Sequence, residues 1–236
     1  MEQLIISLYD YTGEMVRPWA ENGYECHCFD IQHPDEPSIV SFEGGGSIHK
    51  IHWDLQKNLL DLQYVYTDQG SGIGVKIVFG FPVCTDLAVS GAAHFAKKAA
   101  INPNFQEEAA SHARDIAYFA ESLDVPYMIE NPVSVLSTLW KRPDFYFHPY
   151  EYGGYIPENK SEHPLYPEYI APKDAYSKKT SIWSGGGFNQ PPLKPVECLS
   201  YGCSSQHAKL GGSSKKTKDI RSCTPRGYAL AVFEAN

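Results

Sequence analysis

The sequence lacks any long apolar run. None of its hydrophobic stretches approaches the ~20 residues that a membrane-spanning helix needs, and the amino-terminal MEQLIISLYDY has neither the basic start nor the long apolar centre of a signal peptide. We therefore expect a soluble, cytoplasmic protein without a membrane partner. At 236 residues, of which 42% are hydrophobic and 20% charged, the chain can form one well-packed domain, with or without a small appendage.

Cysteine is sparse. The six cysteines, at positions 26, 28, 84, 198, 203 and 223, are too few for a disulfide scaffold, and in a reducing compartment we expect free thiols. Four possible zinc ligands lie in one short region, but they lack the paired Cys-x-x-Cys spacing of structural zinc sites: Cys198, Cys203, His207 and Cys223. The sequence therefore predicts no metal site.

Positive charge is also in short supply. The formal net charge of -8 disfavours nucleic acid as a partner for the chain as a whole. Residues 194–226 are the exception, because seven basic residues there accompany only two acidic ones and leave a net charge of +5. We expect this basic segment to contact the phosphates of DNA. Its basic residues are Lys194, Lys209, Lys215, Lys216, Lys218, Arg221 and Arg226.

The first half of the chain alternates short apolar runs with amphipathic segments, which is typical of an α/β fold with a parallel, doubly wound sheet. Strands are predicted over 3–9, 25–31, 47–55, 75–81, 126–132 and 178–185, and helices over 13–24, 106–123 and 224–235, with a further helix opening directly after Cys84. We divide the chain into a core (1–140), an aromatic-rich and basic irregular lobe (141–223) and a carboxy-terminal helix that packs back on the core (224–236).

Chemically reactive residues stand where the predicted strands end. Ligands of doubly wound sheets bind at the carboxyl ends of the strands, so these side chains should share one rim: Asp10, Asp30, Asp54, Cys84 and Glu130. A thiolate adds readily to electron-poor carbons, and a helix beginning after the turn would favour the charged form of Cys84. A carboxylic acid on the next strand, Glu130, could protonate a ring nitrogen during that attack. Together the pair indicates covalent activation of a heteroaromatic ring.

Three segments resemble motifs of the DNA cytosine carbon-5 methyltransferases. GFPVCTDLAVSG (80–91) is similar to their catalytic Pro-Cys turn, MIENPVS (128–134) to their Glu-Asn dipeptide, and SLYDYTGEMVRPWAENGYECHCFDI (7–31) to their cofactor-binding opening. The ending IRSCTPRGYALAVFEAN (220–236) resembles small phage-encoded members of the family, which lack a full target-recognition domain. The resemblance implies a Rossmann-like methyltransferase sheet with a small irregular carboxy-terminal lobe.

The same resemblance implies a role for individual residues. Cys84 would attack carbon 6 of cytosine, Glu130 would protonate ring nitrogen 3, and Asn131 would hold the loop that carries Glu130. The cofactor would be S-adenosylmethionine, and the positions that match its binding residues are Tyr9, Asp10, Thr12, Gly13, Asp30, Ile31, Asp54 and Pro82. Contacts to the substrate would come from Asn131, Lys178, Lys179 and Thr180.

Departures from the family pattern leave two alternatives open. The segment 186–220 is much shorter than a target-recognition domain, which would suit a free cytosine nucleotide (dCMP) as the acceptor. Ser7 stands where the family has an Asp and Asp10 where it has an Ala, so the cofactor turn is altered. This change would suit a relative without enzymatic activity that binds nucleic acid or a host protein, for example to evade restriction.

Overall fold

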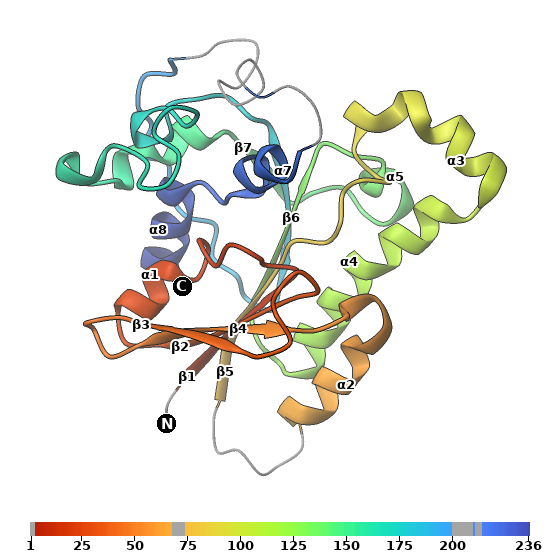
Figure 1. Cartoon of the computed structure of the whole chain (residues 1–236), viewed down its shortest axis with the longest axis horizontal. Helices are drawn as coiled ribbons and strands as arrows, with labels where there is room; N and C mark the ends of the chain where they lie inside the picture. The colour runs from red at the N-terminus through yellow and green to blue at the C-terminus, as the bar shows by residue number, and fades with distance from the viewer. Residues whose placement is uncertain (1–2, 68–73, 200–209, 211–213) are drawn as a thin grey trace. The chain divides into compact units, whose positions relative to one another are not determined.

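A mixed eight-stranded sheet runs through the chain (Figure 1). The computed structural model describes residues 3–67, 74–199, 210 and 214–236. The strand order is β3-β4-β2-β1-β5-β6-β8-β7. Five neighbouring strands run parallel: β4 (Ser47–His52), β2 (Glu25–Asp30), β1 (Gln3–Leu8), β5 (Gly74–Gly80) and β6 (Tyr127–Pro132).

The strands outside this parallel set correct the predicted all-parallel sheet. β3 (Ser38–Ser41) pairs antiparallel with β4, β8 (Thr180–Gly185) pairs antiparallel with β6, and β7 (Phe145–Phe147) follows β8 in the strand order. The short segment 42–46 joins β3 to β4 as a hairpin, whereas residues 133–179 separate β8 from β6. The fold is thus α/β with a mostly parallel sheet, which is compatible with a Rossmann-like arrangement.

The central strands are buried because helices cover them. Leu4, Ile6 and Val78 form one hydrophobic core with side chains of α2 (Leu55–Thr67) and α4 (Phe105–Ser122). The buried face of α4 is rich in alanine, which lets the helix approach the sheet closely. A Cβ atom on Gly80 would lie only 2.8 Å from Ile116 Cγ2, so only glycine allows this approach at the end of β5.

One predicted helix is shorter than expected. Residues 13–24 were predicted to be helical, but α1 covers only Arg17–Glu21. The preceding residues instead close a turn, in which Gly13 has a φ of 72° and donates its N–H to the carboxylate of Asp10. The helix ends at Glu21, and Gly23 just beyond it has a φ of 94°, which is favourable only for glycine.

Short helices fill much of the remaining chain. The 3₁₀ helices are η1 (Val89–His94), η2 (Pro149–Tyr155), η3 (Glu158–Lys160) and η4 (Pro172–Asp174), and the other α-helices are α3 (Phe95–Ile101), α5 (Leu136–Leu139), α7 (Lys215–Ser222) and α8 (Arg226–Ala235). The predictions of α4, β6, β8 and α8 are confirmed within a few residues. Among the described residues, no helix combines the length and the apolar character needed to cross a bilayer.

The chain forms two compact units. Unit 1 comprises residues 1–13, 19–146 and 180–188, and unit 2 comprises residues 14–18, 147–179 and 189–236. Aromatic side chains hold unit 2 together: the rings of Phe147 and Tyr228 stack with centroids 4.0 Å apart, and Tyr152 packs edge-on against both. The sequence-based division at residues 140 and 223 stays a prediction.

A buried carboxyl group of unit 2 makes stability depend on pH. Asp174 is 1% exposed and accepts a hydrogen bond from the N–H of Gly227 at 3.0 Å. Burial raises the pKa of Asp174 from its ordinary value of 3.8 to about 6, against the lowering effects of that hydrogen bond and of Arg226. Between these two values the folded protein holds a proton that the unfolded chain has lost, so the free energy of unfolding falls as pH rises.

We therefore expect Asp174→Asn to remove this dependence of the free energy of unfolding on pH. Asparagine keeps a side-chain acceptor for Gly227 and carries no charge. Between pH 4 and pH 7 the free energy of unfolding of the wild type should fall by about 3 kcal/mol relative to that of the variant. Urea unfolding of both proteins at unit intervals of pH measures the difference. Parallel stability curves for the two proteins would show that Asp174 does not titrate in this range.

Candidate active site

The Pro-Val-Cys turn begins directly at the end of β5. Phe81 continues the sheet by donating its N–H to the carbonyl of Leu8, and Pro82 is buried. The carbonyl of Cys84 then accepts hydrogen bonds from the N–H groups of Leu87 (3.0 Å) and Ala88 (2.8 Å). This closes a turn that leaves the Cys84 side chain half-buried.

The helix predicted to open directly after Cys84 is not there. Residues 85–87 form a turn, η1 begins only at Val89, and α3 begins at Phe95. The cause is long-range pairing, because Ala88 forms an isolated antiparallel bridge with Ser134 and is thereby held extended. A helix N-terminus therefore cannot be the group that favours the Cys84 thiolate.

The segment that carries Glu130 is fastened to this turn. In the parallel pairing of β5 and β6, Gly80 lies opposite Ile129, so Glu130 follows directly at the end of the paired region. Beyond it, the side-chain NH₂ of Asn131 donates to the carbonyl of Pro82 at 3.0 Å. Two backbone hydrogen bonds complete the connection, from Val89 to Val133 and from Val135 to Leu87. The segments bearing Cys84 and Glu130 are thus held against each other, as the predicted shared rim requires.

Cys84 differs from the other thiols of unit 1. Cys26 and Cys28 lie on β2 and are completely buried. Burial raises the pKa of both thiols, and the nearby carboxylates of Glu25 and Asp10 add to the effect at Cys26. These two side chains are neutral, inert parts of the core. Cys84 keeps part of its surface exposed and, of the three, is the one placed to meet a substrate.

Asn131 is buried next to Glu130 and contacts the turn that carries Cys84, and its predicted role in holding the Glu130 segment stays a prediction. It is 1% exposed, and its Oδ1 atom is buried without a hydrogen-bond partner in the described part of the chain. We expect Asn131→Ala to lower the free energy of unfolding by about 1–3 kcal/mol, because the Pro82 carbonyl loses its partner in a buried place. Thermal and urea unfolding measure this change.

A matched control for this substitution is Asn104→Ala. Asn104 is exposed at the start of α4, and its side chain makes no capping hydrogen bond. We expect this variant to unfold like the wild type. If both variants unfold alike, the side chain of Asn131 does not fasten the two segments.

The turn after β1 is organised by Asp10. This carboxylate is 4% exposed and accepts hydrogen bonds from Ser7 Oγ (2.8 Å), Gly13 N (2.7 Å) and Thr12 Oγ1 (3.2 Å). Ser7 and Asp10 therefore act together, and a carboxylate still lies in the turn although residue 7 is a serine. Asp10 shapes the backbone of the predicted cofactor turn, in which Thr12 and Gly13 take part.

Two of the predicted cofactor acids are neighbours. Asp30 ends β2, is 7% exposed, and accepts the N–H of Gln32 at 2.7 Å. Its carbonyl accepts the N–H of Trp53, which brings the following residue, Asp54, close to the same strand end. Asp54 forms an ion pair with Lys57 at 2.8 Å, while Ile31, beside Asp30, exposes 57% of its surface. An apolar side chain and two carboxylates thus lie together at the carboxyl ends of β2 and β4.

Tyr9 joins this group from the end of β1. Its backbone has a φ of 58°, and its hydroxyl is buried without a hydrogen-bond partner among the described residues. Burial raises the pKa of Tyr9, and the charges of Asp115, Asp54 and Asp30 raise it further. Tyr9 is thus close enough to Asp30 and Asp54 for their charges to act on it, and a shared role in cofactor binding stays a prediction.

Two residues of α4 near Tyr9 escaped the sequence analysis. The ring of His112 lies 6.1 Å from that of Tyr9, and burial lowers its pKa despite the opposing charges of Asp115, Asp54 and Glu108. His112 and Asp115 are three residues apart, so they lie on the same side of α4. The signal that could have found them is a His and an Asp at this spacing in a helix that otherwise buries alanine.

The predicted substrate contacts around residue 180 are of two kinds. Thr180 is buried at the start of β8 and lies opposite Pro132, two residues beyond Glu130 in the antiparallel pairing. Lys178 and Lys179 belong to unit 2, where Lys178 Nζ donates to the carbonyl of Arg221 at 2.9 Å and Lys179 is exposed. Thr180 therefore lies beside the strand of Glu130, and Lys178 braces unit 2.

The arginines of the basic segment contact backbone carbonyls of unit 2. Arg221 donates to Leu210 at 2.7 Å, and Arg226 donates to Lys160 and Ser161, each at 2.9 Å.

The exposed cations of residues 194–226 include three lysines of α7, Lys215, Lys216 and Lys218. Lys215 forms an ion pair with Asp219, and Lys216 lies over the ring of Tyr169. Lys194 pairs with Glu234, and Lys209 lies outside the described residues.

The four zinc-ligand candidates cannot be compared as a set. Cys203 and His207 lie outside the described residues. Cys198 and Cys223 are buried in unit 2, and Cys223 Sγ lies 3.8 Å from Nε2 of His163.

Comparisons with known proteins give no family for this chain, so a functional proposal rests on the fold and on the geometry of the site. No protein-family model matches the chain, and no curated protein matches it significantly in sequence. The α/β fold with its mostly parallel sheet is what the structure establishes.

Proposed function

We propose that the protein transfers a methyl group from S-adenosylmethionine to carbon 5 of cytosine, with Cys84 as the nucleophile and Glu130 as the acid. The observation that carries the proposal is the set of hydrogen bonds that fastens the Cys84 turn to the Glu130 strand, above all the one from Asn131 to Pro82. Two reactive groups can act on one ring only if their backbones are held at a constant separation. The rigid connection meets that requirement.

The residues around Asp30 fit the proposed cofactor. A buried carboxylate with one backbone donor suits the hydroxyl groups of a ribose, and the exposed side chain of Ile31 suits the face of an adenine ring. Gly13, with its φ of 72°, lets the backbone of this turn adopt a conformation that other residues rarely adopt, and it packs on Ile48 and Cys28. When bound, S-adenosylmethionine supplies the methyl group, and its sulfonium sulfur becomes a neutral thioether.

Cys84 takes part in the first and the last step of the proposed reaction. Its thiolate forms a bond to carbon 6 of cytosine, which pushes an electron pair into the ring and makes carbon 5 nucleophilic. After carbon 5 has gained the methyl group it loses its proton to solvent, the bond between sulfur and carbon 6 breaks, and the thiolate is restored. Glu130 gives a proton to ring nitrogen 3 as the thiolate attacks and takes it back when the thiolate leaves.

DNA is the acceptor that we favour, and the cytoplasm is the compartment in which we place the reaction. A base in a duplex must be flipped out of the stack before a thiol can reach carbon 6, at a cost of a few kcal/mol. The lysines of α7 would contribute phosphate contacts, and the affinity for DNA would then fall as the salt concentration rises.

A free cytosine nucleotide is the second candidate acceptor. The observation that favours it is the engagement of Arg221 and Arg226 with backbone carbonyls of their own unit, which reduces the charge ready for a polyanion. The catalytic chemistry is the same for both acceptors. They differ in whether phosphate contacts beyond a single nucleotide raise the rate.

A covalent trapping assay tests the proposal. Fluorine at carbon 5 cannot leave as a proton does, so a 5-fluorocytosine acceptor with S-adenosylmethionine should leave the protein attached to the ring through Cys84. Duplex DNA, single-stranded DNA and the free nucleotide, each carrying 5-fluorocytosine, form three arms, and peptide mass spectrometry locates the attachment. Adduct with the nucleotide alone would select the second candidate. No adduct in any arm, together with calorimetry that detects no cofactor binding, would favour a non-enzymatic binding protein.

A further inference from the structure

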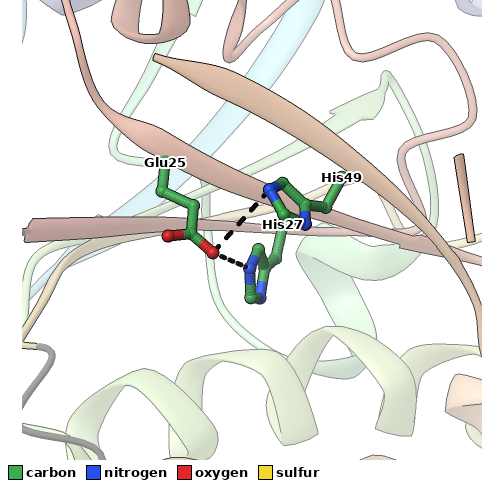
Figure 2. A group of neighbouring side chains, drawn as sticks. All are labelled: Glu25, His27 and His49. Atoms are coloured by element: carbon green, nitrogen blue, oxygen red, sulfur yellow. Dashed lines mark hydrogen bonds and ion pairs between the residues drawn. The ribbon is translucent and has the colours of Figure 1, made fainter. Parts of the chain in front are cut away.

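Two histidines and one glutamate meet on one face of the sheet, away from the proposed active site (Figure 2). Glu25 and His27 are two residues apart on β2, so their side chains point to the same face. His49 on β4 lies directly opposite His27 in the parallel pairing. Glu25 begins β2 and Asp30 ends it. The cluster therefore lies toward the amino ends of the strands, and the proposed cofactor site lies at their carboxyl ends.

The distances within the cluster are close to those of a metal-binding site. Glu25 Oε1 lies 2.7 Å from His27 Nε2 and 3.8 Å from His49 Nε2, and the three ligand atoms lie within 4.8 Å of one another. Tetrahedral ligands at about 2.0–2.1 Å from a zinc ion stand roughly 3.3 Å apart. The two measured distances from the carboxylate bracket that separation, so small side-chain rotations would complete the site.

Partners outside the cluster orient its rings. The Nδ1 atom of His27 lies 2.7 Å from the hydroxyl of Tyr66 on α2, and the Nε2 atom of His49 lies 2.9 Å from Ser47 Oγ. A histidine that binds metal through Nε2 characteristically donates its Nδ1 proton to an oxygen atom behind it, and Tyr66 offers that oxygen to His27. At His49, a metal ion would take the place of the Ser47 hydroxyl as the partner of the Nε2 atom.

Through Glu25, the cluster borders a cavity from which an ion could enter. Glu25 and Ser47 are among the residues that line a cavity of about 430 Å³. Its other walls come from Gln3 of β1, the turn before β2 and the hairpin before β4, including Tyr24 and Gly46. All three cluster residues are half-buried, so the ion would be shielded without being sealed in.

From this geometry we propose that Glu25, His27 and His49 bind a divalent transition-metal ion of the zinc class. Imidazole with carboxylate is a donor set that suits such ions, whereas Mg²⁺ and Ca²⁺ prefer oxygen alone. The ion would join β2 to β4 and, through Tyr66, anchor α2 to the sheet. This site is independent of the proposed methyl transfer.

The competing explanation is an ordinary hydrogen bond between Glu25 and His27. His49 separates the two explanations, because at 3.8 Å it adds little to that pair but is indispensable as a third ligand. We therefore choose His49→Gln as the main variant and Tyr66→Phe as the variant that keeps all three ligands. His94→Gln is the matched control, because His94 is an exposed histidine on η1.

The experiment is calorimetric titration of the full chain, without a histidine tag, with Zn²⁺ and with Co²⁺. We expect one ion to bind per chain and to raise the melting temperature, with binding lost in His49→Gln, weakened about tenfold in Tyr66→Phe and unchanged in His94→Gln. Circular dichroism of each variant without metal checks that it folds. If His49→Gln does not fold, the Tyr66→Phe titration alone decides.

The cysteines of unit 2 are an alternative metal site that the same experiment distinguishes. Co²⁺ bound by nitrogen and oxygen shows only weak visible bands, whereas a cysteine ligand adds a strong charge-transfer band in the near ultraviolet. The expected spectrum has no such band. Absence of binding, a thiolate band, or affinity unchanged in His49→Gln and Tyr66→Phe would each overturn the proposal.

Discussion

Cys84→Ser is expected to lower methyl transfer to cytosine by about 10⁴-fold or more. A serine hydroxyl at the same place is far less ionised than a thiol near neutral pH and is a weaker nucleophile toward carbon 6. Because Cys84 is half-buried in a turn held by backbone hydrogen bonds, the substitution should leave the turn and the fold intact. Radioactive methyl transfer to DNA and to dCMP measures the rate, and urea unfolding confirms the fold.

Cys26→Ser is the matched control for this variant. Cys26 is a thiol of the same unit, completely buried on β2, and its raised pKa makes it inert. We expect it to lose some stability, because a hydroxyl group enters the core, while its rate stays near that of the wild type. Equal methyl transfer by Cys84→Ser and the wild type would remove Cys84 from the mechanism.

Glu130→Gln is expected to lower the same rate by about 10²–10⁴-fold, which is the usual contribution of a positioned acid. Glutamine has the same shape but cannot give up a proton, so the attack on carbon 6 would build negative charge on the ring without relief. Formation of the 5-fluorocytosine adduct should slow by a similar factor, since the acid acts in that first step. Rapid-quench measurement of adduct formation reports this step directly.

The control for charge removal is Glu43→Gln, at an exposed position in the hairpin between β3 and β4. It should react and unfold like the wild type. A Glu130→Gln protein that forms the adduct at the wild-type rate would assign the proton on nitrogen 3 to another group.

The parallel part of the fold could be predicted because its signal is local. Continuous apolar runs such as 75–81 mark strands that are buried on both faces, and the amphipathic pattern of 106–123 marks the helix that covers them. The positions of Asp30 and Glu130 near strand ends follow from the same pattern. Consequently the edge of the sheet that carries the candidate site could be predicted before any long-range contact was known.

The segment after Cys84 could not be predicted in the same way. Its small residues favour a helix locally, but the bridge between Ala88 and Ser134 holds the chain extended, and that contact joins positions far apart in sequence. The short edge strands β3 and β7 were missed for a related reason. Their formation depends on the strand that lies beside each of them, more than on their own residues.

The sequence by itself determined the order in which strands, helices and reactive side chains follow one another, because hydrophobic periodicity and turn residues act over a few positions. Only the tertiary structure decided which of those side chains meet: Asn131 with the Pro82 carbonyl, Tyr9 with His112, and Glu25 with His27 and His49. The physical reason is that such meetings depend on strand register and helix placement, which are set by packing of the whole core.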